Sequence, residues 1–491
     1  MQKFLTLLCA AALVIAFTGI ASAEVQSIKV SGDITTHGIY RNNFDLNDNS
    51  SNDDDRGFVQ STTRLRVDAD LTDNVSTTVR LINERDWGGD NSGSNDTSNT
   101  AGAVPQLETQ GNTNFDNDID LDLASITLKD FLYSPLTVTI GRQELRWGNG
   151  LVLGDPDSND ASAHTLIAPE YSRRKAFDAV RAMLDFDPIM LDGFFSHLSE
   201  GSAGTNNDRD LFGVEANYAF SERSANVAGY FLGEKNLAVD VAASTATQWS
   251  GDAQESGQTQ VLGREIYTVG GRGSIEPTTG LNLMGEVAFQ FGEIISGRDQ
   301  SAWALQTGAT YALDHQWKPS LRGNFVYLSG EETGGPEDST DDHEGWIANF
   351  EDQTWGIIAD QLGRSSPSGG VGQPQTSLTA SGDSQSSDTN MWILNLGASA
   401  SPIQDVTVGA DWYHFVLNEE NDTVGGAGAG QSLVFTNEKD FGDEIDVTAT
   451  YNYTEDLTFG GSLAFFFPGD AFESDAQDTA FQGMGTVEVV F

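Results

Sequence analysis

Cysteine is almost absent from this 491-residue chain, since the only one, Cys9, lies in the amino-terminal apolar segment. The rest of the chain therefore lacks the side chains for a disulfide, a thiolate metal site or a covalent haem attachment. Basic residues are also scarce, with 25 Lys and Arg against 73 Asp and Glu and a formal net charge of −48. This balance argues against a nucleic-acid partner, which requires a basic protein surface.

Long hydrophobic runs are missing beyond the first twenty residues. Lys3 precedes an apolar stretch over residues 4–20, and Ala21-Ser22-Ala23 has the small-x-small form of a signal-peptidase site. This pattern predicts a signal peptide over residues 1–23, cleaved before Glu24, and a single domain over residues 24–491. A membrane-spanning helix is the alternative for the first segment, but the run is short and no second one follows.

What the chain has instead is alternation. Near the C-terminus, apolar Ile445, Val447 and Tyr451 alternate with acidic and hydroxyl residues, a period of two that gives each face of a strand one character. The pattern recurs along most of the chain with no helical segments to cover it. A sheet with an apolar face and a polar face, both uncovered, fits a closed barrel with lipid outside and water inside.

The connections between these strands differ in length in a regular way. Short turns such as Thr72-Asp73-Asn74 and Asp187-Pro188 alternate with long polar loops, of which the longest spans roughly 330–390. Short periplasmic turns and long extracellular loops are typical of an outer-membrane barrel. We therefore predict an all-β, transmembrane, antiparallel up-and-down barrel of about 18 strands, with 16 as the alternative. A barrel of this size encloses a channel or a plugged lumen, and Gly141 predicts a bulge within the strand at 136–148.

Four segments resemble the alginate-export family of outer-membrane porins: GRQELRWGNGLVLG (141–154), RRKAFDAVRAMLDF (173–186), GDEIDVTATYNYTEDLTFG (442–460) and FFFPGDAF (465–472). The resemblance covers most of the mature chain. It implies a large monomeric barrel for one-way passage of a polyanionic polysaccharide or related solutes. In such a channel, arginines lining the lumen meet the carboxylates of the polymer, and the matching positions here are Arg142, Arg146, Arg173, Arg174 and Arg181.

Strand parity predicts further charged side chains on the lumen wall. The second and third strands are basic on this face, and the fourth and closing strands are acidic, which predicts walls of opposite sign and only mild ion preference. The alternative to solute contact for any single arginine is that it only neutralises the charge of neighbouring acidic side chains. The predicted luminal set, beyond the five arginines above, is Arg64, Arg66, Arg80, Arg264, Arg272 and Arg322, with Asp118, Asp120, Asp122, Glu286, Asp411, Glu444 and Asp446.

Other motifs indicate little chemistry. The loop 45–55 offers oxygen ligands at alternate positions, as calcium needs, but it lacks the glycine and the final glutamate of an EF-hand loop. A solvated acidic loop is the better interpretation, calcium the weaker one, and no other cofactor is expected. No histidine pair has metal-site spacing and no serine sits in a nucleophile elbow, so we expect no enzyme. The tryptophans Trp87, Trp147, Trp303, Trp317, Trp392 and Trp412 indicate an interfacial girdle, with sugar stacking left open for Trp147.

These observations predict a passive outer-membrane channel for polar or anionic solutes, or more narrowly an exporter of an acidic polysaccharide or oligosaccharide. The expected partners are outer-membrane lipids, lipopolysaccharide and the solute, and the barrel is expected to be monomeric. The main alternative is a surface adhesin or structural protein that acts through its long acidic loops. A sheath around an electron-transfer cytochrome is a weaker alternative, because this chain has no haem motif.

Overall fold

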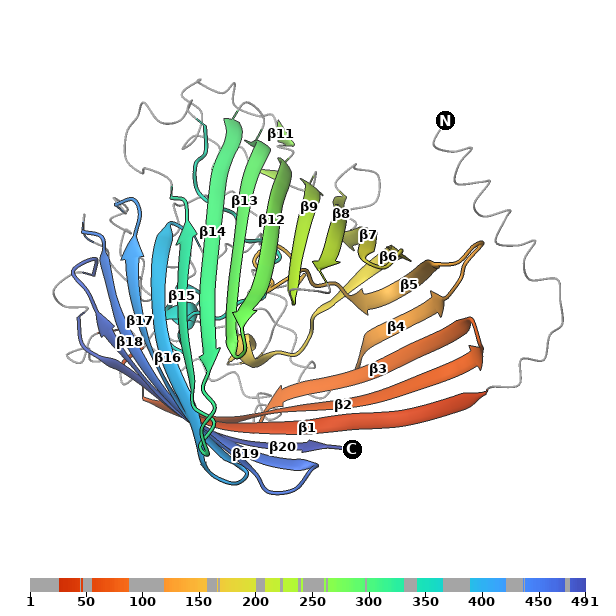
Figure 1. Cartoon of the computed structure of the whole chain (residues 1–491). Coiled ribbons are helices and arrows are strands. Elements are labelled where there is room, and N and C mark those ends of the chain that lie inside the picture. Colours follow the sequence, from red (N-terminus) through yellow and green to blue (C-terminus); the bar gives the residue numbers. More distant parts are fainter. Residues whose placement is uncertain are drawn as a thin grey trace, which may run out of the picture.

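The computed structural model describes residues 26–44, 46, 55–87, 119–156, 166, 168–199, 208–220, 224–236, 240–241, 260–261, 264–295, 298–330, 342–364, 389–420, 436, 438–472 and 477–491. Its main feature is one closed antiparallel sheet of 18 strands, in which each strand pairs with the next along the chain (Figure 1). The ring closes where the last strand pairs with the first, from Asp33↔Val490 to Asn42↔Phe481. The predicted fold and strand number are confirmed.

The strands of the barrel are β1 (Ser27–Asn42), β2 (Arg56–Thr72), β3 (Val75–Asp86), β4 (Asp120–Leu128), β5 (Leu136–Glu144), β6 (Ala176–Asp185), β7 (Ile189–Ser199), β8 (Arg209–Phe220), β9 (Ala225–Asn236), β12 (Arg264–Thr278), β13 (Leu281–Ile295), β14 (Arg298–Ala312), β15 (Ser320–Leu328), β16 (Met391–Ile403), β17 (Val406–Leu417), β18 (Asp440–Asn452), β19 (Leu457–Pro468) and β20 (Ala480–Val490). Outside the barrel, β10 (Asp240–Val241) pairs antiparallel with β11 (Gln260–Val261). Among the residues that the structure describes, the helical elements are the 3₁₀ turn η3 (Pro169–Tyr171) and α2 (Ala359–Arg364). No helix in the described ranges is long and apolar enough to cross a membrane.

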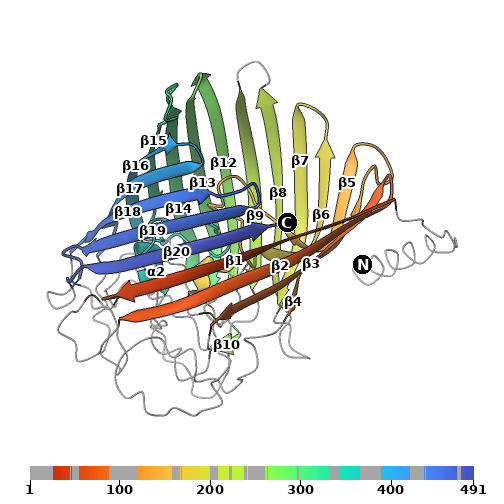
Figure 2. The ribbon, with the colours of Figure 1, turned by 90° about the horizontal axis from the view of Figure 1, so that it is seen from below.

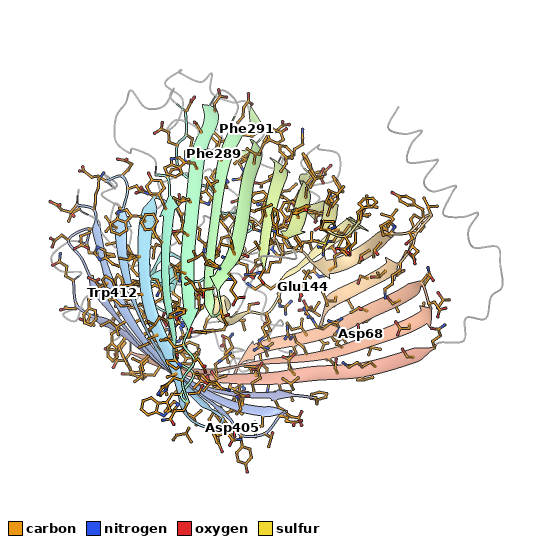
Figure 3. All side chains as sticks on the ribbon, viewed as in Figure 1. Asp68, Glu144, Phe289, Phe291, Asp405 and Trp412 are labelled. Atoms are coloured by element: carbon orange, nitrogen blue, oxygen red, sulfur yellow. The ribbon has the colours of Figure 1, made fainter. Side chains whose placement is uncertain are left out.

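The period-two pattern sorts side chains between the two faces of the wall. On β18, Ile445 and Val447 are exposed on the outside, whereas Glu444 and Asp446 are buried on the inside. Aromatic side chains such as Phe289, Phe291 and Trp412 lie on the outer side of the wall (Figure 3). Because every backbone group of a closed ring can pair with a neighbouring strand, such a wall can face lipid with its apolar side.

Two local irregularities change which face a residue occupies. The pairing of β3 with β4 shifts between Arg80 and Leu81, so that Asp122 becomes an extra residue and Leu123 turns to the buried inner face. The bulge predicted at Gly141 is wrong, because the pairing of β5 with β4 and β6 runs through Gly141 without a shift. Gly141 instead has a φ of 117°, and a Cβ there would lie 2.2 Å from the carbonyl oxygen of Ala124.

Three segments fold into the ring and fill part of it. We call them the tryptophan loop (145–156), the basic loop (168–175) and the strap (342–364). The apolar side chains of the tryptophan loop and the strap join inward-facing wall residues in one core cluster, and α2, at the end of the strap, lies inside the ring in Figure 2. The barrel thus has an apolar outer belt and a second apolar core within its lumen, which narrows the path.

Candidate functional site

The tryptophan loop is anchored by Trp147. Its indole Nε1 donates to Asp192 Oδ2 at 3.1 Å, and its rings lie 5.4 Å from Phe194 and 5.8 Å from Tyr230 between centroids. The Trp147 side chain is only 3% exposed. The girdle position predicted for Trp147 is therefore wrong, because the chain turns inward directly after β5 and carries this side chain into the lumen.

The glycines of the same motif make the inward turn possible. Gly148 and Gly150 have φ values of 53° and 85°, a region that glycine adopts without strain. A Cβ on Gly148 would lie 2.6 Å from Cδ of Arg272, and one on Gly150 would lie 2.8 Å from the carbonyl oxygen of Asp352. The motif thus encodes a turn that passes close to the wall on one side and to the strap on the other.

The strap is docked on the tryptophan loop through backbone and side-chain contacts. The Gly154 amide donates to Phe350 O at 2.7 Å, and the Asp352 amide donates to Gly150 O at 2.8 Å. The Asp352 carboxylate forms ion pairs with Arg146 and, at 3.0 Å, with Lys175. The Arg146 side chain therefore joins the tryptophan loop to the strap, although it remains 46% exposed.

The remainder of the strap is held by the wall. Gln290 donates from Nε2 to Ile347 O at 2.7 Å and accepts from the Ile347 amide at 2.9 Å. The side-chain Nδ2 of Asn349 donates to Glu234 Oε2 at 2.7 Å. At its far end, the Glu444 carboxylate accepts three backbone amides, those of residues 357–359. This number of attachments indicates a fixed constriction rather than a loop in free motion.

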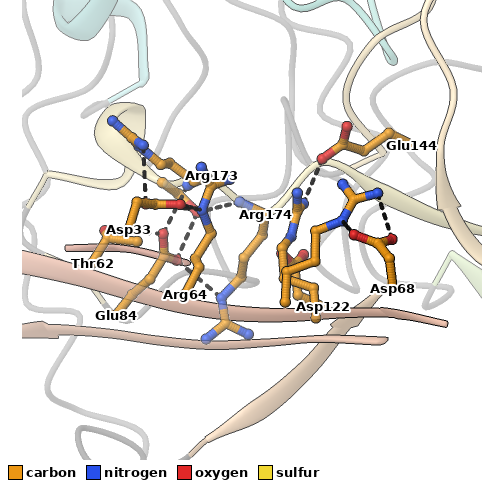
Figure 4. Close-up of polar contacts among 12 residues, drawn as sticks. Asp33, Thr62, Arg64, Asp68, Glu84, Asp122, Glu144, Arg173 and Arg174 are labelled. Atoms are coloured by element: carbon orange, nitrogen blue, oxygen red, sulfur yellow. Dashed lines mark hydrogen bonds and ion pairs between the residues drawn. The ribbon is translucent and has the colours of Figure 1, made fainter. Parts of the chain in front are cut away.

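The wall formed by β1 to β5 has interleaved charges (Figure 4). Arg64 pairs with Asp33 of β1 at 3.0 Å, and Arg66 pairs with Asp68 on its own strand at 2.8 Å. Arg80 lies between Asp122 and Glu144, the latter at 2.5 Å. The prediction of a basic wall facing an acidic one is therefore wrong in this part of the ring, because each basic residue has an acid beside it.

The other predicted basic residues pair in the same way. Arg181 forks onto Asp192 with two bonds of 2.8 Å, and Arg272 Nη2 lies 2.7 Å from both oxygens of Glu215. The remaining pairs are Arg264 with Glu234 at 2.8 Å, Arg322 with Asp411 at 2.6 Å from Nε, Arg174 with Glu84 at 3.0 Å and Asp120 at 2.6 Å, and Arg173 with Asp33 at 3.2 Å and Glu488 at 2.8 Å.

Arg142 does not belong to the lumen. It pairs with Asp178 across β5 and β6 at 3.2 Å, directly opposite in register. On these two strands the same face carries Ile140 and Val180, both exposed by more than 40% on the lipid side. The luminal position implied for Arg142 by the family resemblance is therefore wrong, because the register continues unbroken through Gly141 and residue 142 keeps the face of residue 140.

Several sequence-based predictions fall outside the described residues. These are Asp118, most of the acidic loop 45–55, and the signal peptide over residues 1–23. Within the described ranges, no group of three or more His, Cys, Asp or Glu side chains is arranged to hold a metal ion.

Sequence reasoning missed the acids that hold the inner loops. Glu488 stands between Val487 and Val489 on a strand that alternates, so its parity could have indicated a luminal position. Asp33 lies directly opposite Arg64 in register, and it pairs with both Arg64 and Arg173. Asp352 had no such signal, because the strap has no strand periodicity that would place its side chains.

A family model for alginate export matches residues 27–484. The chain belongs to the alginate export family. Among solved structures, Pseudomonas aeruginosa OccK2 (OpdF) superposes with a TM-score of 0.52 at 9% identity, over 95% of this chain and 98% of that one. Acinetobacter baumannii OccAB1 gives 0.51 at 10% identity, over 97% and 99%. Such low identity shows the fold alone, and no curated protein matches the chain.

Family and fold together identify an outer-membrane barrel of the porin type. This confirms the family suggested by the four sequence segments, three of which the structure assigns to specific tasks. The first forms the tryptophan loop, the second contributes the basic loop, and the third contributes Glu444, which holds the strap.

Proposed function

We propose that this alginate export family member is a passive channel for polar and anionic solutes, with no catalytic role. The observation that supports it best is the polar inner face, where several charged side chains stay accessible beside the inner loops. Arg66 and Asp120 are 42% and 47% exposed, and Glu144 is 49% exposed. A charge on a channel wall acts on every solute that passes.

The test is the reversal potential under a salt gradient in planar bilayers. Arg66→Ala removes an accessible luminal charge, and we expect it to shift the reversal potential away from anion preference. Arg142→Ala is the matched control, because it removes the same charge from the outer face and should leave the reversal potential unchanged. Absence of any discrete conductance in the wild type would refute the channel, as would equal shifts in the two variants.

We further propose acidic oligosaccharides as one solute class. Guanidinium groups bind carboxylates in a forked geometry, and the inner face of the wall presents Arg66 on β2 and Arg322 on β15 with exposed fractions of 42% and 36%. Addition of an oligouronate to one side should then block the current in a concentration-dependent way. A neutral oligosaccharide of equal length is the control, and equal block by both would remove the argument for anionic solutes. The adhesin alternative depends on loops that lie mostly outside the described residues.

A further inference from the structure

The closing pair of the ring, β1 with β20, is where an interior contact would matter most. Most neighbouring strands are consecutive in the chain, whereas these two are its first and last and no connection links them. Two acids face the lumen at this seam, Asp33 on β1 and Glu488 on β20. Two carboxylates close together repel one another unless a cation lies between them.

The basic loop supplies that cation, although it is distant along the chain from both strands. Arg173 Nη1 lies 3.2 Å from Asp33 Oδ2, and its Nη2 lies 2.8 Å from Glu488 Oε1. One guanidinium therefore spans both strands of the seam, and its contact with Asp33 is drawn in Figure 4. Thr35, opposite Glu488 in register, donates to the same carboxylate at 3.3 Å.

The residues before Arg173 repeat the arrangement one step further along the seam. Glu170 pairs with Arg41 of β1, and Arg41 Nε donates to Gln482 of β20 at 2.8 Å. Gln482 Nε2 in turn donates to the Tyr171 hydroxyl at 2.7 Å. The Tyr171 ring lies 5.1 Å from that of His37, and burial raises the pKa of Tyr171, so its hydroxyl stays protonated.

The residues after Arg173 reach the other inner structures. Arg174 pairs with Glu84 of β3 and with Asp120 of β4. Lys175 pairs with Asp155 of the tryptophan loop and with Asp352 of the strap. Three consecutive basic residues thus connect the seam, the neighbouring wall and the constriction.

We propose that the basic loop is an interior clasp that holds the seam closed and fixes the constriction relative to it. Arg173 is then a positioning residue whose guanidinium is engaged by Asp33 and Glu488, and its role is distinct from the solute contact that the family resemblance implies. This assignment is independent of which solute the channel passes.

The first test is a double-mutant cycle on the unfolding rate of the purified barrel in detergent, followed as loss of the heat-modifiable folded band. Arg173→Ala removes two charge-assisted hydrogen bonds, and we expect unfolding to accelerate about tenfold. Glu488→Gln should accelerate it less, and the double variant should unfold no faster than Arg173→Ala alone, since the two residues act through one contact. Additive effects, or a wild-type rate in Arg173→Ala, would overturn the clasp.

A milder variant and a control keep the test interpretable. Arg173→Lys keeps the charge but cannot fork across two carboxylates, and about a threefold acceleration is expected. Arg66→Ala breaks a pair that lies within β2 and away from the seam, and it should unfold at the wild-type rate. If Arg66→Ala accelerates unfolding as much as Arg173→Ala does, the proposal is overturned, because the loss of any luminal arginine would then have the same effect.

The reversal potential separates this role from solute contact. A clasp predicts that Arg173→Lys, measured below its unfolding temperature, keeps the wild-type reversal potential while it unfolds faster. If Arg173→Lys and Arg173→Ala shift the reversal potential and leave the unfolding rate unchanged, Arg173 contacts the solute and the clasp is refuted. Failure of the channel proposal itself would show as absent conductance in the wild type, with the unfolding cycle unaffected.

Discussion

The attachment of the strap to Glu444 gives a quantitative prediction about pore width. The Glu444 carboxylate is fully buried and accepts the amides of Ile357 at 2.5 Å, Ile358 at 2.8 Å and Ala359 at 2.7 Å. Glu444→Gln changes one atom of this acceptor set. The remaining carboxamide oxygen still accepts hydrogen bonds from the backbone amides of Ile357 and Ile358. The new NH₂ group faces the Ala359 backbone amide, so two hydrogen-bond donors oppose one another in a buried site.

The free-energy change follows from these contacts. A hydrogen bond to a charged group contributes about 1.5–3 kcal/mol, and a buried unpaired donor costs about 1–3 kcal/mol, so a loss of about 3 kcal/mol is expected. At 1.4 kcal/mol for each factor of ten, the ratio of docked to undocked strap falls by about 150-fold. Gln290 and Asn349 still hold the middle of the strap, so the release concerns its far end.

Single-channel recording in planar bilayers measures this release. The wild type should show a steady open level, because the strap is fixed at several points. Glu444→Gln should show repeated excursions to a larger conductance as the far end of the strap leaves the lumen. The barrel itself should keep its thermal unfolding temperature, since no strand pairing is altered.

The matched control for Glu444→Gln is one residue away. Asp443→Asn changes a carboxylate on the outer face of β18, where it contacts Trp412 and His414 and does not touch the strap. Its recordings should match the wild type. If Glu444→Gln gives the same steady level as Asp443→Asn, the strap does not set the width of the path and the reasoning fails.

Three further predictions concern glycine positions, the tryptophan loop and the mature N-terminus. Gly148→Ala should lower stability by about 1–2 kcal/mol in thermal unfolding, because residue 148 has a positive φ and no room for a Cβ, whereas Gly485→Ala, with nothing within 4 Å, should change it by less than about 0.5 kcal/mol. Trp147→Ala should lose about 3–5 kcal/mol and widen the path, seen as a lower unfolding temperature with a higher conductance. Mass spectrometry of the protein purified from outer membranes should find Glu24 as the first residue, and a mass that retains residues 1–23 would contradict the predicted signal peptide.

The strand pattern could be predicted from the sequence because it is local. A period of two depends only on the residue itself and its neighbours along the strand, so Arg64, Arg66 and Arg80 were placed correctly on the inner face. The luminal prediction for Arg142 failed at one irregular position, and Leu123 turns inward at another. An extra residue in β4 reversed parity where none was expected, and a glycine in β5 kept parity where a reversal was expected.

The contents of the lumen could not be predicted in the same way. The tryptophan loop, the basic loop and the strap have no periodicity, so nothing in their sequence says that they turn inward. Their partners are also distant along the chain, as with Arg146 and Asp352 or Arg173 and Glu488. The sequence GRQELRWGNGLVLG carries the family resemblance, yet its structural role, a glycine-permitted turn against the strap, depends on a segment roughly two hundred residues later in the chain.

The inner face of the wall is lined with alanine where the strap and its neighbours pack, at Ala288, Ala302 and Ala304, none more than 4% exposed. In a hydrogen-bonded ring the circumference is fixed by the number and tilt of strands. Here the bore is determined separately, by an interior filling that rests on small side chains. Changes in the length of three loops would therefore retune the bore while every strand pairing stays the same. The same strand framework can then accommodate solutes of different sizes when only the interior loops differ.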